Sequence, residues 1–348
     1  MLRGALLNIF IVNTPYHLLI TTTLHTKNDL VIIIDDFNVE KSTFCSDLIE
    51  KKMKENKIII IKGLRSFRGK PLNLFRYIRE IKKRAKNINA NFDGNLFLFN
   101  DGNPFNQIFI SNLRNSRDVI LIEEGIGLYR DVKKRHHFLY DVIGKSIFGL
   151  SFQNTRRIGG HKNTSIIVCN LPECLSDIQL EKEIFLINEF CSIDKNFLSS
   201  LNKTIPKEKF DIFISQPLVE DGVLPENLYI KKLDSIFKKV IRKNHNFYIK
   251  PHPRESKNKY TYFEKKYGVK IVEDKDIPIE IFLSNQDSSF VYTVYSSAFY
   301  NIAKYLKLDN FLLYDLFAID PKLPEPMLKS SQVNVIKSLS ELPIKKEN

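Results

Sequence analysis

The chain alternates continuous apolar runs with amphipathic segments, and this alternation constrains its fold more than any other feature. Apolar runs in the first half lie at Leu6–Val12, Leu30–Ile34, Lys57–Ile61, Asn95–Phe99 and Asp118–Ile122. Runs that do not alternate with polar residues are typical of strands buried on both faces of a parallel sheet. Segments such as Phe105–Leu113 lie between them and are amphipathic. The pattern predicts an α/β domain built on a parallel sheet.

A second alternation follows a polar stretch, Lys195–Lys209, which is the best linker candidate. Strands are predicted at Phe210–Ile214, Asn246–Ile249, Val269–Val272 and Phe290–Val294, and helices at Leu233–Ile241, Tyr260–Tyr267, Pro278–Leu283 and Ser296–Leu306. A chain of 348 residues is long enough for two domains. We expect an N-terminal domain at residues 1–195, a linker at 196–209 and a C-terminal domain at 210–348. Both would be doubly wound and Rossmann-like, and they would face a central cleft.

The composition is that of a folded protein, with 43% apolar and 27% charged residues. The four cysteines match no zinc pattern and are interpreted as reduced thiols of a cytoplasmic protein. No apolar run reaches membrane-spanning length, and none resembles a signal peptide. The net charge of +13 indicates a polyanionic partner: nucleic acid, an acidic membrane surface or a phosphorylated substrate.

Much of the positive charge is concentrated in two clusters. Arg65–Lys86 is rich in Arg and Lys, has Glu80 as its one acid, and carries apolar residues that partly fit helical spacing. A second cluster is Lys133–His137. Basic amphipathic segments can dock on anionic lipid headgroups. The alternative is a solvated helix face with ordinary core contacts.

Two short motifs in the second half follow predicted strands. Lys250-Pro251-His252-Pro253-Arg254 closes one strand, and Tyr295-Ser296-Ser297 closes another and opens a helix. The prolines stiffen the turn around His252. A histidine can donate a charge-assisted hydrogen bond or a proton to a phosphate, and a helix N-terminus offers backbone N–H groups to the same anion. We therefore expect His252, Ser296 and Ser297 to hold a departing phosphate.

Several acidic residues are candidates for the remaining roles. Glu280 lies between the two motifs and can accept hydrogen bonds from ribose hydroxyls. Two acidic strand ends compete to supply a general base: Glu123-Glu124-Gly125 and Glu220-Asp221-Gly222. Asp274-Lys275-Asp276 is a poor metal motif, and neither GxGxxG nor a phosphate loop is present. No metal and no cofactor are predicted.

In this order, the motifs resemble the bacterial lipooligosaccharide sialyltransferases, family 52 of the glycosyltransferases. Thr14-Pro15-Tyr16-His17-Leu18-Leu19 looks like the turn after that family's first strand, and Pro251-His252-Pro253-Arg254 looks like its His-Pro motif. The resemblance implies a GT-B fold, the donor CMP-sialic acid, and inverting, metal-independent transfer. It implies that His252 assists CMP departure, that Ser296 and Ser297 hold the phosphate, and that Glu280 binds the ribose. Lys250, Pro251 and Arg254 would complete the donor site.

The family's general base would correspond to Asp221, with Glu220 beside it as a rival. Related sialyltransferases use the second acid of the N-terminal motif, here Glu124, which stays the alternative base or an acceptor-side carboxylate. The implied acceptor is a terminal galactose of a lipooligosaccharide or capsular glycan, with α-2,3 linkage expected ahead of α-2,6 or α-2,8. The implied location is the cytoplasmic face of the inner membrane, reached through the basic clusters. A homodimer is compatible with the resemblance.

Two other interpretations stay open. The same fold could use another nucleotide sugar or polymerise sialic acid. A non-catalytic basic protein that binds RNA or membranes is the third hypothesis, although no helix-turn-helix, RNA-recognition or zinc-finger pattern is present and no nucleic-acid partner is predicted.

Overall fold

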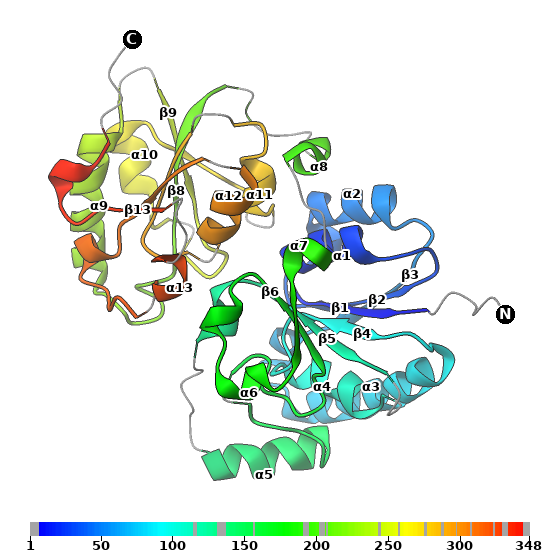
Figure 1. Cartoon of the computed structure of the whole chain (residues 1–348). Coiled ribbons are helices and arrows are strands. Elements are labelled where there is room, and N and C mark those ends of the chain that lie inside the picture. The colour runs from blue at the N-terminus through cyan, green and yellow to red at the C-terminus, as the bar shows by residue number, and fades with distance from the viewer. Residues whose placement is uncertain are drawn as a thin grey trace. The chain divides into compact units, whose positions relative to one another are not determined.

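The computed structural model describes residues 7–343 except 114–116, 131–136, 156, 191–194, 202–205, 207, 243–244, 257, 275–276, 287–288, 297, 307, 323 and 329–332. Contacts divide the chain into two compact units, Met1–Ser192 (unit 1) and Ile193–Asn348 (unit 2) (Figure 1). The start of the stretch predicted as a linker is helical, because α8 spans Lys195–Ser200, and it belongs to unit 2.

Unit 1 is built on a seven-stranded sheet in the order β3-β2-β1-β4-β5-β6-β7, and the paired strands are parallel. The strands are β1 (Ile9–Val12), β2 (Leu30–Asp35), β3 (Lys57–Lys62), β4 (Leu96–Leu98), β5 (Val119–Ile122), β6 (Ile166–Cys169) and β7 (Glu183–Leu186). The first five lie where apolar runs predict them, whereas β6 and β7 are additional. β1 and β5 are buried along their whole length, as expected for strands covered on both faces.

Several helices of unit 1 begin at sequence signals typical of helix N-termini. They are α1 (Pro15–Leu24), α2 (Thr43–Lys52), α3 (Pro71–Asn91), α4 (Pro104–Ser111), α5 (His137–Phe148), α6 (Asp177–Leu180) and α7 (Ile187–Phe190), with short 3-10 turns η1 (Val39–Lys41), η2 (Leu64–Phe67), η3 (Ile126–Tyr129) and η4 (Pro172–Cys174). Thr14 caps α1 and Asn103 caps α4, and each is followed by proline. Figure 1 shows α1 and α2 on one face of the sheet and α3 and α4 on the other.

Unit 2 repeats the plan on a six-stranded parallel sheet in the order β10-β9-β8-β11-β12-β13. Its strands are β8 (Phe210–Ile214), β9 (Asn246–Lys250), β10 (Lys270–Ile271), β11 (Phe290–Thr293), β12 (Asp309–Leu312) and β13 (Val333–Val335). Besides α8, its helices are α9 (Glu226–Val240), α10 (Thr261–Tyr267), α11 (Ile279–Phe282), α12 (Ala298–Leu306) and α13 (Glu325–Leu328), with 3-10 turns η5 (Asp315–Phe317) and η6 (Leu339–Glu341).

Both sheets have the strand order of a doubly wound fold. The first strand of each unit lies inside its sheet, and the order reverses beside it, between β1 and β4 in unit 1 and between β8 and β11 in unit 2. Ligands of such folds bind beyond the carboxyl ends of the strands at this switch point. The predicted fold class, two Rossmann-like units with parallel sheets, is confirmed.

The basic segment Arg65–Lys86 forms η2 and most of α3. Ile78, Ile81 and Ala85 anchor α3 in the core of unit 1. At its N-terminal end, Leu72 and Phe75 are 74% and 45% exposed among the basic side chains. The other cluster, Lys133–His137, lies outside the residues whose side chains the structure describes. In the described part of the chain, no helix combines the length and the apolarity needed to cross a membrane.

Candidate functional site

The carboxyl-end edge of the unit 2 sheet brings the two phosphate motifs to either side of one strand. β8 pairs with β9 and with β11. Ser215 Oγ, just past the end of β8, accepts the His252 N–H at 3.1 Å, and Gln216 Oε1 accepts the Tyr295 N–H at 2.8 Å. Two consecutive residues therefore tie the His252 loop and the segment before Ser296 to the same strand end.

A buried carboxylate, Glu255, holds the His252 loop. Its Oε2 accepts the His252 N–H at 2.7 Å and the Ser215 hydroxyl. Its Oε1 accepts Lys259 Nζ at 2.7 Å and the Tyr260 hydroxyl at 2.8 Å. Glu255 and Lys259 are both buried, so this ion pair lies in the interior of unit 2 and fixes the loop to it. Glu255 was not predicted as a site residue, although its position three residues after His252 could have indicated a role in holding this loop.

The imidazole of His252 is held in one tautomer. Its Nδ1 accepts the Arg254 N–H at 3.2 Å, so Nδ1 bears no hydrogen and Nε2 carries it. The ring is then a neutral donor through Nε2. The two roles predicted for His252, ligand of a phosphate and acid, stay predictions.

Lys250 and Glu280 lie in the interior of unit 2. Lys250 Nζ donates to the Asp274 carbonyl at 3.2 Å. Glu280, in α11, accepts Asn301 Nδ2 at 2.9 Å. Burial raises the pKa of Glu280, and the Asn301 hydrogen bond and the Lys250 charge oppose that rise. Lys250 and Glu280 thus interact electrostatically, while one Glu280 oxygen is engaged by Asn301.

Ser296 lies at the predicted strand-to-helix junction. It lies between β11 and α12, which begins at Ala298, and its N–H donates to Thr293 Oγ1 at 3.2 Å. Thr293 in turn donates to the Ile214 carbonyl of β8 at 2.8 Å. Ser297, its predicted partner, lies outside the described residues.

The two acids that follow β8 are both paired with cations. Asp221 forms a bidentate pair with Arg254, at 2.5 Å (Oδ1–Nη1) and 3.0 Å (Oδ2–Nη2). Glu220 accepts Lys259 Nζ at 2.9 Å. Burial by itself would raise the pKa of Glu220, but the hydrogen bond and charge of Lys259, together with backbone hydrogen bonds, lower this pKa. A lowered pKa makes Glu220 a weaker base.

The acidic pair after β5 divides into one buried and one accessible carboxylate. Glu123 is buried and accepts the Tyr129 hydroxyl and the Asn170 N–H, both at 2.6 Å. Glu124 is partly exposed and its Oε2 lies 2.8 Å from His17 Nε2. Gly125 follows at φ 137°, a conformation that is essentially restricted to glycine. The glycine permits the turn that follows Glu124.

Behind Glu124 lies a polar cluster at the switch point of unit 1. Asn13 follows β1, and its side chain exchanges hydrogen bonds with the side chain of Asn106 in α4, at 3.1 and 3.3 Å. Asn106 also donates to the Asn100 carbonyl, which follows β4, at 2.7 Å. Apart from Glu124, these residues were not predicted as site residues; His17 was noted only as part of the opening turn.

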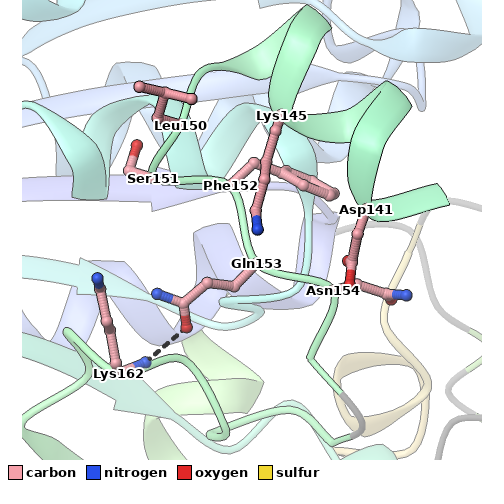
Figure 2. Close-up of a pocket in the computed structure, with 8 residues that line it drawn as sticks. All are labelled: Asp141, Lys145, Leu150, Ser151, Phe152, Gln153, Asn154 and Lys162. Carbon is pink, nitrogen blue, oxygen red and sulfur yellow. Dashed lines mark hydrogen bonds between the residues drawn. The ribbon is translucent and has the colours of Figure 1, made fainter. Parts of the chain in front are cut away.

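A pocket of about 380 Å³ lies elsewhere on unit 1, beside α5 (Figure 2). Its lining is Asp141, Lys145, Leu150, Ser151, Phe152, Gln153, Asn154 and Lys162. The Lys162 N–H donates to Gln153 Oε1 at 3.0 Å, a contact between two of the lining residues (Figure 2). None of the predicted site residues lines it.

Among the described residues, no group of three or more His, Cys, Asp or Glu side chains could hold a metal ion. Asp276 of the weak acidic motif lies outside the described residues. Cys45 and Cys169 are buried, and Cys174 is partly buried.

Two Rossmann-like units in one chain, each with polar groups at its switch point, are the architecture of GT-B glycosyltransferases. Residues 8–315 match the sequence model of the family described as Alpha-2,8-polysialyltransferase (POLYST). The match covers well over half of the 348 residues, so the chain belongs to this family. The predicted sialyltransferase class is thereby confirmed, whereas the family shown is the polysialyltransferase family and the narrower resemblance to family 52 is not shown.

Solved structures with low sequence identity are also similar. Staphylococcus aureus MnaA with UDP has 10% identity and a TM-score of 0.51, over 88% of this chain and 79% of that chain, and supports the fold. The α/β-galactoside α-2,3-sialyltransferase of Photobacterium phosphoreum has 12% identity and a TM-score of 0.49, over 97% and 99%. The GT-B domain of a Photobacterium damselae sialyltransferase has 14% identity and a TM-score of 0.45, over 94% and 98%. A comparison with curated proteins gave no match.

Proposed function

We propose that the protein transfers sialic acid from CMP-sialic acid to the end of a sialylated glycan, by an inverting reaction without a metal, and that it repeats this transfer to build an α-2,8-linked polymer. The family match over residues 8–315 is the observation that carries the proposal. It favours polymerisation over the single α-2,3 transfer to galactose that the motifs alone led us to expect.

The donor half of the reaction would take place at the unit 2 edge. Negative charge develops on the CMP phosphate as it departs, and donors fixed in advance near that charge lower the barrier. His252 Nε2–H would supply one such donor, because its loop is fixed by Glu255 and its tautomer by the Arg254 N–H. Ser296, Ser297 and the start of α12 would supply the others. Lys250 and Glu280 would face the nucleoside, as the resemblance implies.

We propose Glu124 as the general base in place of Asp221, the first candidate from the sequence. A base must accept the proton of the attacking hydroxyl as the new bond forms. Both oxygens of Asp221 accept hydrogen bonds from Arg254, and Glu220 is paired with Lys259. Glu124 is partly exposed, and in the described part of the chain its ion-pair partner is His17. Its position at the carboxyl end of β5 is where a doubly wound unit places ligand-binding groups.

The first experiment incubates purified protein with CMP-sialic acid and a fluorescent sialyl-lactoside, with and without EDTA. CMP release and product mass are measured together. A ladder of products that persists in EDTA supports metal-independent polymerisation. Addition of one residue would instead support single transfer. Folded protein that releases no CMP would contradict the donor assignment and direct attention to other nucleotide sugars.

A matched pair of variants tests the base. Glu124→Gln is expected to lower kcat about 10²- to 10⁴-fold, the range typical of a lost general base. Asp221→Asn removes the other candidate carboxylate in an isosteric way, and we expect a loss of less than about tenfold, since it weakens only an exposed ion pair. Full activity of Glu124→Gln together with an inactive Asp221→Asn would reverse the assignment.

We further propose that the exposed face of α3 brings the enzyme to an anionic membrane surface, at the cytoplasmic face of the inner membrane. Leu72 and Phe75 are exposed next to basic side chains of the Arg65–Lys86 cluster. Apolar side chains that insert below the headgroups and cations that pair with them are the two contributions that hold an interfacial helix.

A further inference from the structure

We propose that His17 is a positioning residue, which holds the Glu124 carboxylate through its Nε2–H in the orientation needed to accept a proton. This role rests on the proposed function of Glu124 as the base. The two side chains come from α1 and from the end of β5, 107 residues apart in the chain.

The contact joins a buried ring to an accessible carboxylate. His17 Nε2 and Glu124 Oε2 are 2.8 Å apart, and the side chains are 2% and 27% exposed. The carboxylate can thus reach a substrate, while the ring that holds it cannot. A carboxylate that accepts a hydrogen bond from a fixed donor keeps one orientation instead of rotating in solvent.

Two contacts fix the imidazole itself. The ring stacks on Phe99, with centroids 4.1 Å apart and planes at 7°. The Asn13 N–H donates to Nδ1 at 3.2 Å, so the hydrogen of the neutral ring lies on Nε2 and points at Glu124. One Glu124 oxygen, Oε2, is therefore engaged by a donor, and Oε1 is the oxygen assigned to the acceptor hydroxyl.

The backbone around His17 explains why this position is rigid. Thr14 caps α1, and its Oγ1 accepts the His17 N–H at 3.2 Å, while the His17 carbonyl accepts the Thr21 hydroxyl at 2.8 Å. Asn13, which sets the tautomer, is held by Asn106. The segment Asn13–His17 thus has contacts to α1 and α4 that do not depend on Glu124.

A buried histidine could also serve stability alone, so the variants separate the two roles. Gln carries its amide nitrogen close to the place of Nε2 and can donate to Glu124, whereas Phe keeps the stacking on Phe99 and has no donor. We expect His17→Phe to lower kcat about 10- to 100-fold with little change in the KM for CMP-sialic acid, and His17→Gln to recover most of that loss.

His161 provides the matched control. It is buried in the same unit, and its Nδ1 also accepts a backbone N–H, from Asn163 at 3.2 Å, whereas the histidine that contacts Glu124 is His17. His161→Gln is expected to leave kcat within about twofold of the wild type, and thermal unfolding of every variant reports its stability. If His17→Gln and His17→Phe lose kcat equally, or in proportion to a fall in Tm, the positioning role is refuted.

The double variant His17→Phe, Glu124→Gln completes the test. If His17 acts through Glu124, the double variant is no slower than Glu124→Gln alone, because there is no base left to position. Independent, multiplicative losses overturn the inference while leaving Glu124 as the base. A fully active Glu124→Gln, or a wild type that does not release CMP, overturns the proposed function and with it this role of His17.

Discussion

Replacing Glu255 with glutamine should destabilise unit 2 more than any ordinary surface change. Glutamine keeps the shape of the side chain, but its amide NH2 replaces one acceptor oxygen. That NH2 must face either the His252 N–H and the Ser215 hydroxyl or Lys259 and the Tyr260 hydroxyl, all of which donate to Glu255. The substitution therefore creates a buried conflict between donors whichever way the amide is turned.

The expected magnitude follows from the burial of the pair. Lys259 is buried and would keep Glu220 as its ion-pair partner after the substitution. The lost interaction is therefore that of a buried donor left without its acceptor, which costs about 1–3 kcal/mol. For domains of about 150–250 residues, 1 kcal/mol shifts Tm by about 2–4 °C, so the unit 2 transition should fall by about 2–12 °C. The same variant should lose turnover, because the His252 loop is no longer fixed.

Differential scanning calorimetry of the whole protein measures this shift, with Glu208→Gln as the control. Glu208 pairs with Lys270 in the same unit, at 3.0 Å, but both side chains are about half exposed. An exposed pair contributes about 0–1 kcal/mol, so the control transition should barely move. Equal shifts for the two variants would refute the argument that the buried pair holds the loop.

Three further predictions follow from other parts of the molecule. Burial, with the charges of two nearby lysines, lowers the pKa of His161 to about 4 from 6.5, so the unfolded chain binds the extra proton first as the pH falls. The free energy of unfolding should therefore keep its full value above pH 6.5 and fall by up to about 3 kcal/mol as the pH drops towards 4. Urea titrations of His161→Asn should lack this pH-dependent loss. The pair Leu72→Ser, Phe75→Ser should weaken sedimentation with anionic vesicles severalfold and leave turnover of a soluble acceptor unchanged; unchanged vesicle binding contradicts docking through α3. Gly125→Ala should cost about 1–3 kcal/mol of stability and displace Glu124, which thermal unfolding and kcat both report; a variant that matches the wild type in both contradicts the argument from φ.

Much of the fold can be predicted from the continuous apolar runs, because such short runs are typical of strands buried on both faces of a parallel sheet. The runs locate β1 to β5, but the expected burial on both faces is wrong for β3, which lies at the edge of the sheet and is largely exposed or half-buried. β7 was missed because it is a short edge strand with a charged first residue and an exposed last one, so its pattern does not differ from that of a loop. β12 was missed for a related reason: Asp309 and Asn310 begin it, although Asn310 is buried.

The site was harder to predict than the fold, since its contacts depend on topology. The motif around His252 could be found because proline and histidine are adjacent in the chain. The contact between His17 and Glu124 could not, because it requires the positions of β1 and β5 within one sheet. The ion pairs of Asp221 and Glu220 were also beyond sequence reasoning, and they weaken the case for the base favoured from the motif alone.

The locked tautomer of His252 bears on which leaving groups the site can tolerate. A neutral imidazole offers a hydrogen but no net charge, and the guanidinium of Arg254 is already neutralised by Asp221. The phosphate that links CMP to a sugar has one negative charge, whereas the diphosphate of a UDP-sugar has two. Discrimination between the two donor classes would then arise from electrostatic balance as well as from the shape of the base, and a competitor such as UDP would bind weakly even where its ring fits.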